Sequence, residues 1–383
     1  MSSTATNPAV DGVIERVRKV YGSWTRETTV ARMRQDWDEL FGGVPVNAQI
    51  EDVDAGGVKA QWVTAPGADA RRAILYFHGG GFQVGSLVSH RELMAGLSAA
   101  AQCRVLGVDY RLAPEHRYPA ALDDASAAWQ WLAGQGFAPG QVALAGDSAG
   151  GGLALGLLLR LRDAGQALPA AAVLMSAWTD LTASGASYGT RADADPIHQR
   201  PMIVAMARNY LGKEGNAADP LVSPLFADLQ GLPPLLAQVG DRETVLDDSR
   251  DFIARAKEAG VDATLQVWDH MIHVFQQFPA QLPEARAAID DMGLEWIEEP
   301  LTAEDVAFTL TVLLDPSYDG DTDITLANIA GGADYKAGKA DSVSGLKVID
   351  PLTLQVTTTQ PGATTLAKIG GPVLSKAWYG KGY

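Results

Sequence analysis

The sequence has few of the residues from which disulfides and metal sites are built. Its 383 residues include one cysteine, Cys103, and six histidines. A lone cysteine cannot form an internal disulfide, and Cys103 lies in the apolar run CRVLGVDY, so we expect a buried and inert thiol. The segment DGDTD begins like a calcium-binding loop but lacks the glycine and the terminal glutamate of that motif. We therefore expect no metal and no cofactor.

Basic side chains and long apolar runs are also scarce. The chain has 30 lysines and arginines against 46 acidic residues, a net charge of −16. This charge argues against nucleic acid or an anionic membrane as a partner. No apolar run approaches the ~18 residues that a membrane span needs, and the first 20 residues lack the apolar core of a signal peptide. The expected protein is soluble and cytoplasmic, without a membrane span.

Arginine disappears near the end of the chain. All 20 arginines precede residue 301, whereas six of the ten lysines follow residue 300. Threonine also becomes frequent there, as in LTLQVTTTQPGATTL. A single domain rarely changes its basic residue so abruptly, so we expect a separate C-terminal unit over residues 300–383.

The preceding residues alternate between short apolar runs and segments of helical length. The expected strands are AQWVTA, AILYFH, CRVLGVDY, VALAGD, AAVLMSAW, PPLLAQVG and ATLQVWD. The expected helices are His90–Ala101, Ala120–Ala133, Ala149–Ala164, Asp248–Ala259 and Pro283–Glu298. This alternation predicts an α/β fold with a mostly parallel sheet flanked by helices.

Two segments do not follow this alternation. Residues 11–42 have the apolar spacing of amphipathic helix. The segment Thr179–Asn216 is interpreted as an insertion, helical near Met202–Leu211. The predicted organisation is an N-terminal cap (1–45) and a catalytic domain (46–299) with a cap insertion at 179–216.

The stretch GDSAGG places Ser148 between two glycines, after an apolar strand and before a helix. This is the setting of a nucleophile elbow, G-x-S-x-G, in which the glycines allow a crowded turn that exposes the hydroxyl. The simpler reading is a glycine-rich strand-to-helix turn, such as a phosphate loop. A P-loop also needs a lysine that this stretch lacks.

Two further motifs suit acyl transfer. His78-Gly79-Gly80-Gly81 follows a strand directly, and its glycines would let backbone N–H groups face a ligand, as in an oxyanion-hole loop. Two histidines in WDHMIHVF, His270 and His273, follow the last strand and are candidates for the general base.

A carboxylate that orients the general base is expected in the acid-rich stretch QVGDRETVLDDSRDF. The carboxylate must lie in the turn after its strand to reach the imidazole. Asp247 and Asp248 stand where the next helix should begin, a position that Asp caps well. Asp251 is expected on the solvent side of that helix. Asp241 and Glu243 belong to the turn itself.

These motifs, in this order, resemble the hormone-sensitive-lipase family of α/β-hydrolase esterases. The resemblance covers about residues 10–298 and rests on HGGGF, YRLAPEHRYPAALDD, GDSAGGGLA, DPLVSP, LPPLLAQVGDRETVLDDS and HMIHVF. It implies an α/β-hydrolase fold, with Ser148 as nucleophile and His273 as base. It also implies an oxyanion hole formed by the N–H groups of Gly80, Gly81 and Ala149.

The resemblance also ranks the candidate acids. The family motif is an acid followed three residues later by leucine, which Glu243-Thr244-Val245-Leu246 matches, although most members carry aspartate there. Glu243 is therefore the expected acid, with Asp247 and Asp241 as alternatives. By the same resemblance, YRLAPE and DPLVSP are structural supports, so their charged residues are expected to be scaffold: Asp109, Arg111, Glu115 and Asp219.

The expected function is a serine carboxylesterase that hydrolyses short-chain acyl esters. The expected partner is a small-molecule ester, and a homodimer is left open. One alternative is a lactonase, because YGSWTRETTVARMRQDW and the body of the chain resemble monoterpene ε-lactone hydrolases. Another is a non-catalytic ligand-binding protein of the same fold, like the plant gibberellin receptors, although these lack the histidine that His273 supplies.

The tail carries a second resemblance. LTAEDVAFTLTVLLDPSYDG, VIDPLTLQVTTTQP and the closing YGKGY resemble part of a family-5 extracellular solute-binding protein. We interpret residues 300–383 as a fused fragment of such a protein. A transport-associated binding protein is the function that this segment alone would suggest.

Overall fold

The computed structural model describes residues 7–292, 302–318, 320, 322–360, 369 and 373–374. The chain divides into two compact units, Met1–Glu295 and Trp296–Tyr383. Each unit has a hydrophobic core of its own.

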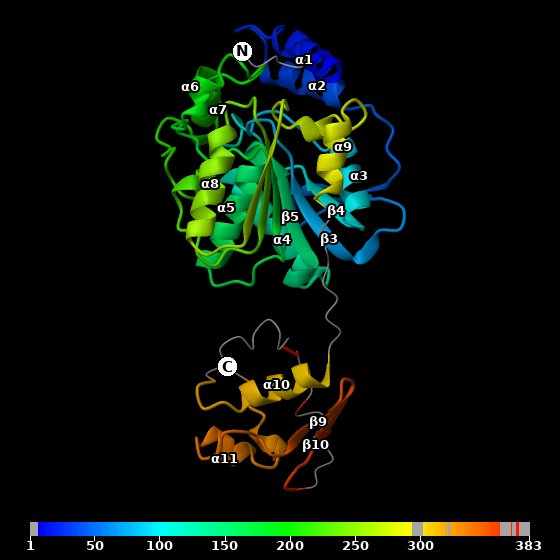
Figure 1. The fold of residues 1–383 in the computed structure, drawn as a ribbon, viewed down its shortest axis with the longest axis vertical. Helices are drawn as coiled ribbons and strands as arrows, with labels where there is room; N and C mark the ends of the chain where they lie inside the picture. The colour runs from blue at the N-terminus through cyan, green and yellow to red at the C-terminus, as the bar shows by residue number, and fades with distance from the viewer. Residues whose placement is uncertain are drawn as a thin grey trace. The chain divides into compact units, whose positions relative to one another are not determined.

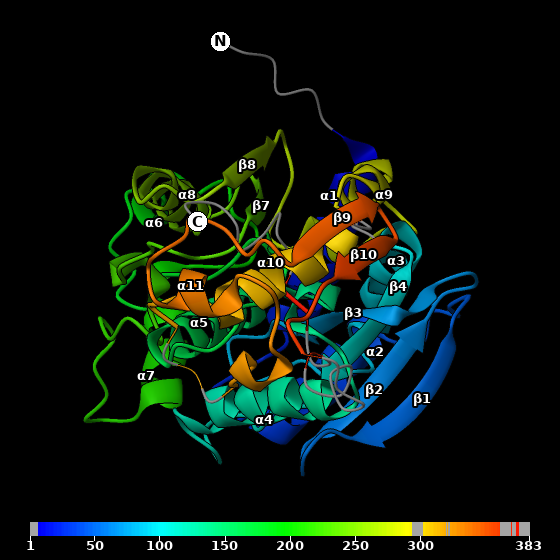
Figure 2. The ribbon, with the colours of Figure 1, turned by 90° about the horizontal axis from the view of Figure 1, so that it is seen from below.

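An eight-stranded sheet lies at the centre of the first unit. Its order is β1-β2-β4-β3-β5-β6-β7-β8, and Figure 2 shows β1 and β8 at opposite edges. The strands are β1 (Gln49–Asp54), β2 (Lys59–Thr64), β3 (Asp69–Phe77), β4 (Cys103–Val108), β5 (Val142–Asp147), β6 (Ala172–Met175), β7 (Leu235–Gly240) and β8 (Ala263–Trp268). Strands β3 to β8 are parallel, whereas β2 is antiparallel to both of its neighbours. This confirms the predicted, mostly parallel sheet.

Helices cover both faces of this sheet. They are α3 (Arg91–Ala100), α4 (Ala120–Gly134), α5 (Ala149–Asp163), α8 (Leu246–Glu258) and α9 (Pro283–Asp290). Helix α3 packs on α9 and on β2 and β4, while α5 packs on α4 and the central strands. Figure 1 shows α3 and α9 on one side of the sheet and α5 and α8 on the other. The expected helix Pro283–Glu298 ends at Asp290, and its last residues lie outside the described part of the chain.

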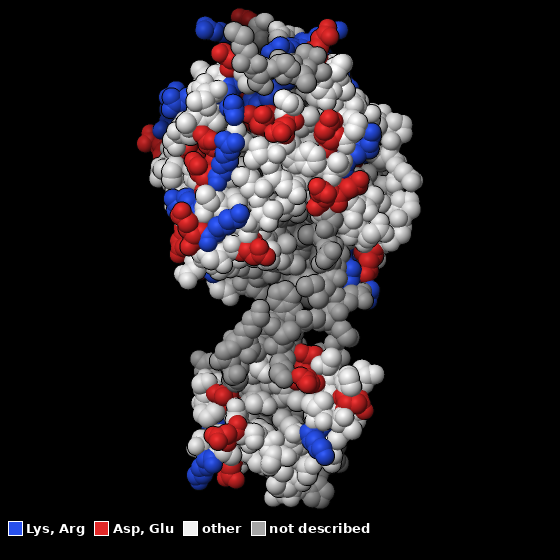
Figure 3. Space-filling view, in the orientation of Figure 1, with Lys and Arg blue, Asp and Glu red and all other residues white. Residues whose placement is uncertain are grey.

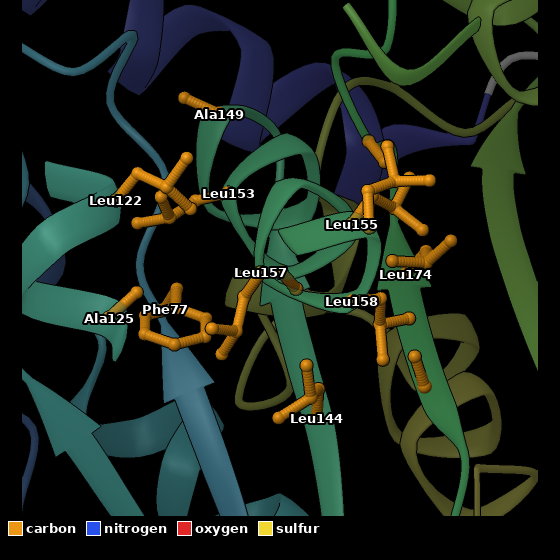
Figure 4. Close-up of a cluster of buried hydrophobic side chains, with 14 of the residues drawn as sticks. Phe77, Leu122, Ala125, Leu144, Ala149, Leu153, Leu155, Leu157, Leu158 and Leu174 are labelled. Carbon is orange, nitrogen blue, oxygen red and sulfur yellow. The ribbon is translucent and has the colours of Figure 1, made fainter. Parts of the chain in front are cut away.

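Helix α5 is the most deeply buried helix of this arrangement. Leucines on several of its sides are inaccessible to solvent. Figure 4 shows Leu157 and its neighbours packed among Phe77 and Leu144 of the sheet and Leu122 of α4. Burying each such leucine contributes roughly 1.5–3 kcal/mol. This packing holds the turn at the start of α5, where Ser148 lies, against a rigid support.

Four helices extend across one end of the sheet (Figure 1): α1 (Pro8–Tyr21), α2 (Val30–Phe41), α6 (Ser187–Thr190) and α7 (Arg200–Leu211). The segment expected to be helical over 11–42 is therefore two helices. Side-chain caps begin both of them, since Asn7 accepts the N–H of Ala9 and Thr29 that of Arg32. We call α1, α2 and residues 179–216 the cap.

Two details differ from, or add to, the sequence expectation. Strand β1 was not expected, because it is polar and mostly exposed at the edge of the sheet and so lacks an apolar run. Cys103 is fully buried, and burial raises the pKa of its thiol to about 12, which keeps it protonated.

On the face in Figure 3, acidic and basic side chains are interspersed over the first unit. No helix within the described residues is long and apolar enough to cross a membrane.

The second unit is small. It contains α10 (Ala303–Leu313), α11 (Gly332–Lys336) and a hairpin of β9 (Leu346–Asp350) and β10 (Thr353–Val356). A capping box joins Thr302 and Asp305 at the start of α10. The hydrophobic core of this second unit includes Leu310, Leu314 and Ile329. The closing YGKGY lies outside the described residues.

Candidate active site

Ser148 lies in a tight turn between β5 and α5. Its backbone has φ 50° and ψ −120°, a conformation that stores on the order of 1–3 kcal/mol of strain. A Cβ atom at Gly146 would strike the carbonyl oxygen of Gly150, and one at Gly150 would strike that of Phe77. Both flanking positions of G-x-S-x-G therefore require glycine for steric reasons.

The structure brings together Ser148, His273 and Glu243, from three separate turns at the carboxyl ends of strands. His273 Nε2 lies 2.8 Å from Ser148 Oγ, and His273 Nδ1 lies 2.7 Å from Glu243 Oε2. Because an ionised carboxylate only accepts hydrogen bonds, the proton belongs on Nδ1. Nε2 is then free to accept the hydrogen of the serine hydroxyl.

Glu243 is fixed by two hydrogen bonds besides the one to His273. Its Oε1 atom accepts the hydroxyl of Ser176 at 2.8 Å and the N–H of Gly240 at 2.5 Å. The Ser176 hydroxyl in turn accepts the N–H of Val274 at 3.1 Å, next to His273. Sequence reasoning missed Ser176; its only signal was a polar residue directly after a buried strand.

The other acidic candidates lie elsewhere. Asp241 accepts the N–H of His270 at 2.7 Å, which places His270 away from Ser148. Asp247 and Asp248 are in the first turn of α8, but Val245 occupies the cap position. Their carboxylates instead accept backbone N–H groups of the segment 179–187.

The electrostatics of His273 suit a base. Burial lowers the pKa of His273, but the charge and the hydrogen bond of Glu243 outweigh burial and raise it above its ordinary value of 6.5. Asp195 and Asp147 raise it further. The carboxylates therefore favour the protonated ring that forms when the histidine accepts a proton.

The glycine loop faces the same turn. Gly80 and Gly81 have φ values of 114° and 61°, which only glycine adopts readily. A Cβ atom at Gly81 would lie 2.5 Å from Met206 Sδ. Among the hydrogen bonds of the described residues, none uses the N–H of Gly80, Gly81 or Ala149 as its donor. These three groups are thus available for an oxygen atom bound beside Ser148.

A buried carboxylate supports that loop from below. Asp147 accepts the N–H of Gly79 at 2.9 Å and the hydroxyl of Tyr76, and it lies 3.4 Å from Nε2 of His90. Burial raises the pKa of Asp147, but the charge of His90 and these hydrogen bonds lower it overall. His90 stands at the start of α3 and is completely buried.

A cavity lies over Ser148 and is mostly apolar. The cap supplies one wall and the catalytic domain the other. The residues of the cap wall are Val17, Tyr21, Trp37, Phe41, Ile197, His198, Ile203 and Met206. The remaining lining includes Trp178, Val274 and Phe278.

His198 of the insertion is part of this wall and touches the base. Its ring meets that of His273 edge-on, with centroids 4.3 Å apart. Burial, and then the charge of His273, lower the pKa of His198 to about 3, so it is neutral at neutral pH.

Three of the four charged residues expected to be scaffold lie in ion pairs or turns. Arg111 pairs with Asp124 at 2.7 Å, and Glu115 pairs with Arg34 of α2 at 2.8 Å. Asp219 accepts the N–H of Leu221 in a turn. Over the residues described, no group of three or more His, Cys, Asp or Glu side chains is arranged to hold a metal ion.

Comparison with known proteins identifies similar chains. A family model described as alpha/beta hydrolase fold matches residues 74–277. An acetyl-hydrolase of Streptomyces hygroscopicus is 43% identical over 287 residues, which are 73% of this chain and 94% of that protein. An esterase of Acinetobacter venetianus is 39% identical over 263 residues, covering 68% of this chain and 86% of the other.

Solved structures of esterases are also similar to this chain. An esterase from the bacterial hormone-sensitive lipase family has a TM-score of 0.73 and 46% identity, and the match covers 76% of this chain and 97% of that one. An esterase/lipase from an uncultured bacterium has a TM-score of 0.71 and 43% identity, covering 75% and 97%.

Proposed function

The chain belongs to the hormone-sensitive-lipase family of α/β-hydrolase esterases and is a carboxylic ester hydrolase, and from this premise we propose that it cleaves short-chain acyl esters through Ser148, His273 and Glu243. The observation that carries the proposal is the unbroken row of contacts from Ser148 Oγ through the imidazole to Glu243 Oε2. This row ends beneath a mostly apolar cavity, the kind of site in which small molecules bind.

The first half of the proposed reaction acylates the serine. Ser148 Oγ attacks the ester carbonyl carbon as its proton passes to His273 Nε2. The carbonyl oxygen becomes an oxyanion, which accepts the N–H groups of Gly80, Gly81 and Ala149. The tetrahedral intermediate then collapses, the bond to the alcohol oxygen breaks, and the imidazolium returns its proton to the leaving alcohol.

The second half releases the acid. His273 Nε2 takes a proton from a water molecule whose oxygen attacks the acyl carbon. The same N–H groups hold the second oxyanion. When this oxyanion collapses to the carboxylic acid, the bond to Ser148 Oγ breaks and Oγ takes the proton from the imidazolium. Glu243 stabilises the imidazolium in both halves and keeps its Nδ1–H in place. No cofactor takes part in these steps.

The proposed preference for short acyl chains rests on the cavity. Trp37, Phe41 and Phe278 line it with bulky rings, which leave little room for a long acyl chain. A series of p-nitrophenyl esters from acetate to dodecanoate tests this. We expect kcat/KM to be highest for acetate to hexanoate and to fall steeply beyond octanoate. A maximum at dodecanoate would refute the preference.

The same chemistry would open a lactone ring. No feature of the cavity favours a ring over a linear ester, so we propose the linear ester as substrate. Turnover of ε-caprolactone, measured beside p-nitrophenyl butyrate, decides between the two. A much higher kcat/KM for the lactone would make ring opening the main activity.

We also propose a division of labour along the chain. Residues 1–45 and 179–216 cap the cavity, 46–299 carry the chemistry, and 300–383 form a fused unit that resembles part of a solute-binding protein and takes no part in hydrolysis. Support comes from the separate cores of the two units and from a site whose residues all belong to the first. If the full chain bound peptides and had no esterase activity, this proposed division would be contradicted.

A further inference from the structure

A second carboxylate, Asp195, is buried in the cap insertion close to the site. It is only 3% exposed and lies in the segment between α6 and α7. One oxygen accepts the N–H groups of Ile197 and His198 at 2.9 and 2.8 Å. The other accepts the N–H and the hydroxyl of Thr244 at 2.8 and 3.1 Å. All four donors are neutral.

Such a placement costs free energy. Burying a carboxylate without a cation is expensive even when hydrogen bonds satisfy it. None of the ion pairs among the described residues includes Asp195. An asparagine or serine could cap the same turn more cheaply. Holding the turn therefore does not by itself explain why a carboxylate stands at this position.

The donors of Asp195 connect it to two members of the site. Thr244 directly follows Glu243 in the chain. On the other side of Glu243, the guanidinium of Arg242 donates to the carbonyl of Ala194 at 3.3 Å. The segment at 194–195 therefore holds the turn of Glu243 from both sides. Its next anchor, at His198, sets that ring against His273.

The charge of Asp195 also acts on the base. The charged groups that face His273 are Glu243, Asp195 and Asp147, and each raises the pKa of His273. The neutral His198 ring covers a face of the imidazole without adding a positive charge. In a site closed to water, a carboxylate at this position favours the imidazolium of the intermediate.

We propose that Asp195 is a positioning residue of the hydrolysis, which couples the cap to the triad by holding the turn of Glu243, seating His198 on His273 and adding negative charge beside the base. The inference rests on the proposed function of Ser148, His273 and Glu243. It makes the order of the cap segment a condition for full activity, rather than only a wall for the substrate.

The test compares Asp195→Asn with Asp193→Asn, a control that removes the same charge from an exposed position two residues earlier. The titration of His273 is followed by NMR of the imidazole in the full chain, with His273→Gln used to assign its signal. In Asp195→Asn we expect the midpoint to fall by on the order of half a pH unit, the acid limb of kcat/KM to move with it, and kcat to fall about tenfold. Asp193→Asn should match the parent in all three.

A folded Asp195→Asn protein with the parent midpoint and acid limb would overturn the proposal, even if its melting temperature were lower. If this variant does not fold, Thr244→Val decides, because it keeps the charge and removes one donor. We expect kcat to fall about threefold at unchanged KM, and the parent kcat would overturn the proposal. The NMR titration needs no substrate, so a parent chain without esterase activity would refute the function while the effect of Asp195 on His273 would still be measured.

Discussion

The hydroxyl of Ser176 joins Glu243 to the turn that carries His273. It donates to Glu243 Oε1 at 2.8 Å and accepts the N–H of Val274, the residue after His273, at 3.1 Å. One side chain thus sets the distance between the turns that follow β7 and β8. This link therefore supports the orientation of the imidazole, which Glu243 bonds directly.

Replacing Ser176 by alanine should therefore weaken both catalysis and folding. Glu243 would lose one buried hydrogen bond and the N–H of Val274 its acceptor, at a cost of about 1–3 kcal/mol in the free energy of unfolding. We expect kcat/KM to fall about tenfold as the imidazole loses its fixed position. Urea unfolding and ester hydrolysis measure the two effects. Ser126→Ala, on α4, is the control, and equal activities of the two variants would contradict the role of Ser176.

Glu243→Gln should be far more harmful than Asp247→Asn. The glutamine amide has no negative charge to stabilise the imidazolium of His273, and it does not keep the proton on Nδ1. We therefore expect kcat to fall on the order of 10³–10⁴-fold. Asp247 binds only the N–H of Ser187 and, at 3.9 Å, Arg250. Its replacement should cost about 1 kcal/mol of stability and leave kcat within about twofold. The reverse order would mean that the acid has been misassigned.

The acid limb of the pH profile of kcat/KM should have its midpoint above pH 6.5. His273 must be neutral to accept the serine proton, and its pKa is raised above 6.5 by Glu243 despite burial. Lowering the pH through this pKa protonates the base and reduces kcat/KM. The same shift contributes stability that is complete below pH 6.5 and is lost as the pH rises through the raised pKa. A pH profile of kcat/KM with its acid midpoint below 6.5 would contradict this assignment.

Removing the tail should leave catalysis intact. The first unit contains every residue that lines the cavity and has a core separate from that of the second unit. A chain ending at residue 299 is expected to hydrolyse p-nitrophenyl butyrate with kcat/KM within about twofold of the full chain. A loss of tenfold or more in a folded truncated chain would show that the tail supports the site.

Several features could be predicted because the information is local in the sequence. The apolar runs identify seven of the strands, and the elbow glycines identify the turn of Ser148. The choice of Glu243 among five carboxylates came from the resemblance to the family motif, which is itself a local pattern. These signals depend on residues within a few positions of one another, which is why sequence alone can carry them.

The supports of the site could not be predicted, because they join distant segments. Ser176 reaches Glu243 across 67 positions, and Asp195 reaches Thr244 across 49. Neither residue belongs to a periodic pattern. His90, an ordinary polar residue in the sequence, becomes a buried partner of Asp147 only when the start of α3 meets the end of β5. Strand β1 escaped notice because its side chains are polar at an exposed edge.

The most direct test of the account is the rate of p-nitrophenyl butyrate hydrolysis by Ser148→Ala in the full chain. The variant removes one oxygen atom and should fold like the parent, which a melting curve can establish. Because His273 and Glu243 then have no nucleophile to activate, we expect kcat to fall on the order of 10⁶-fold. A folded Ser148→Ala protein that hydrolyses the ester at the parent rate would contradict the central claim.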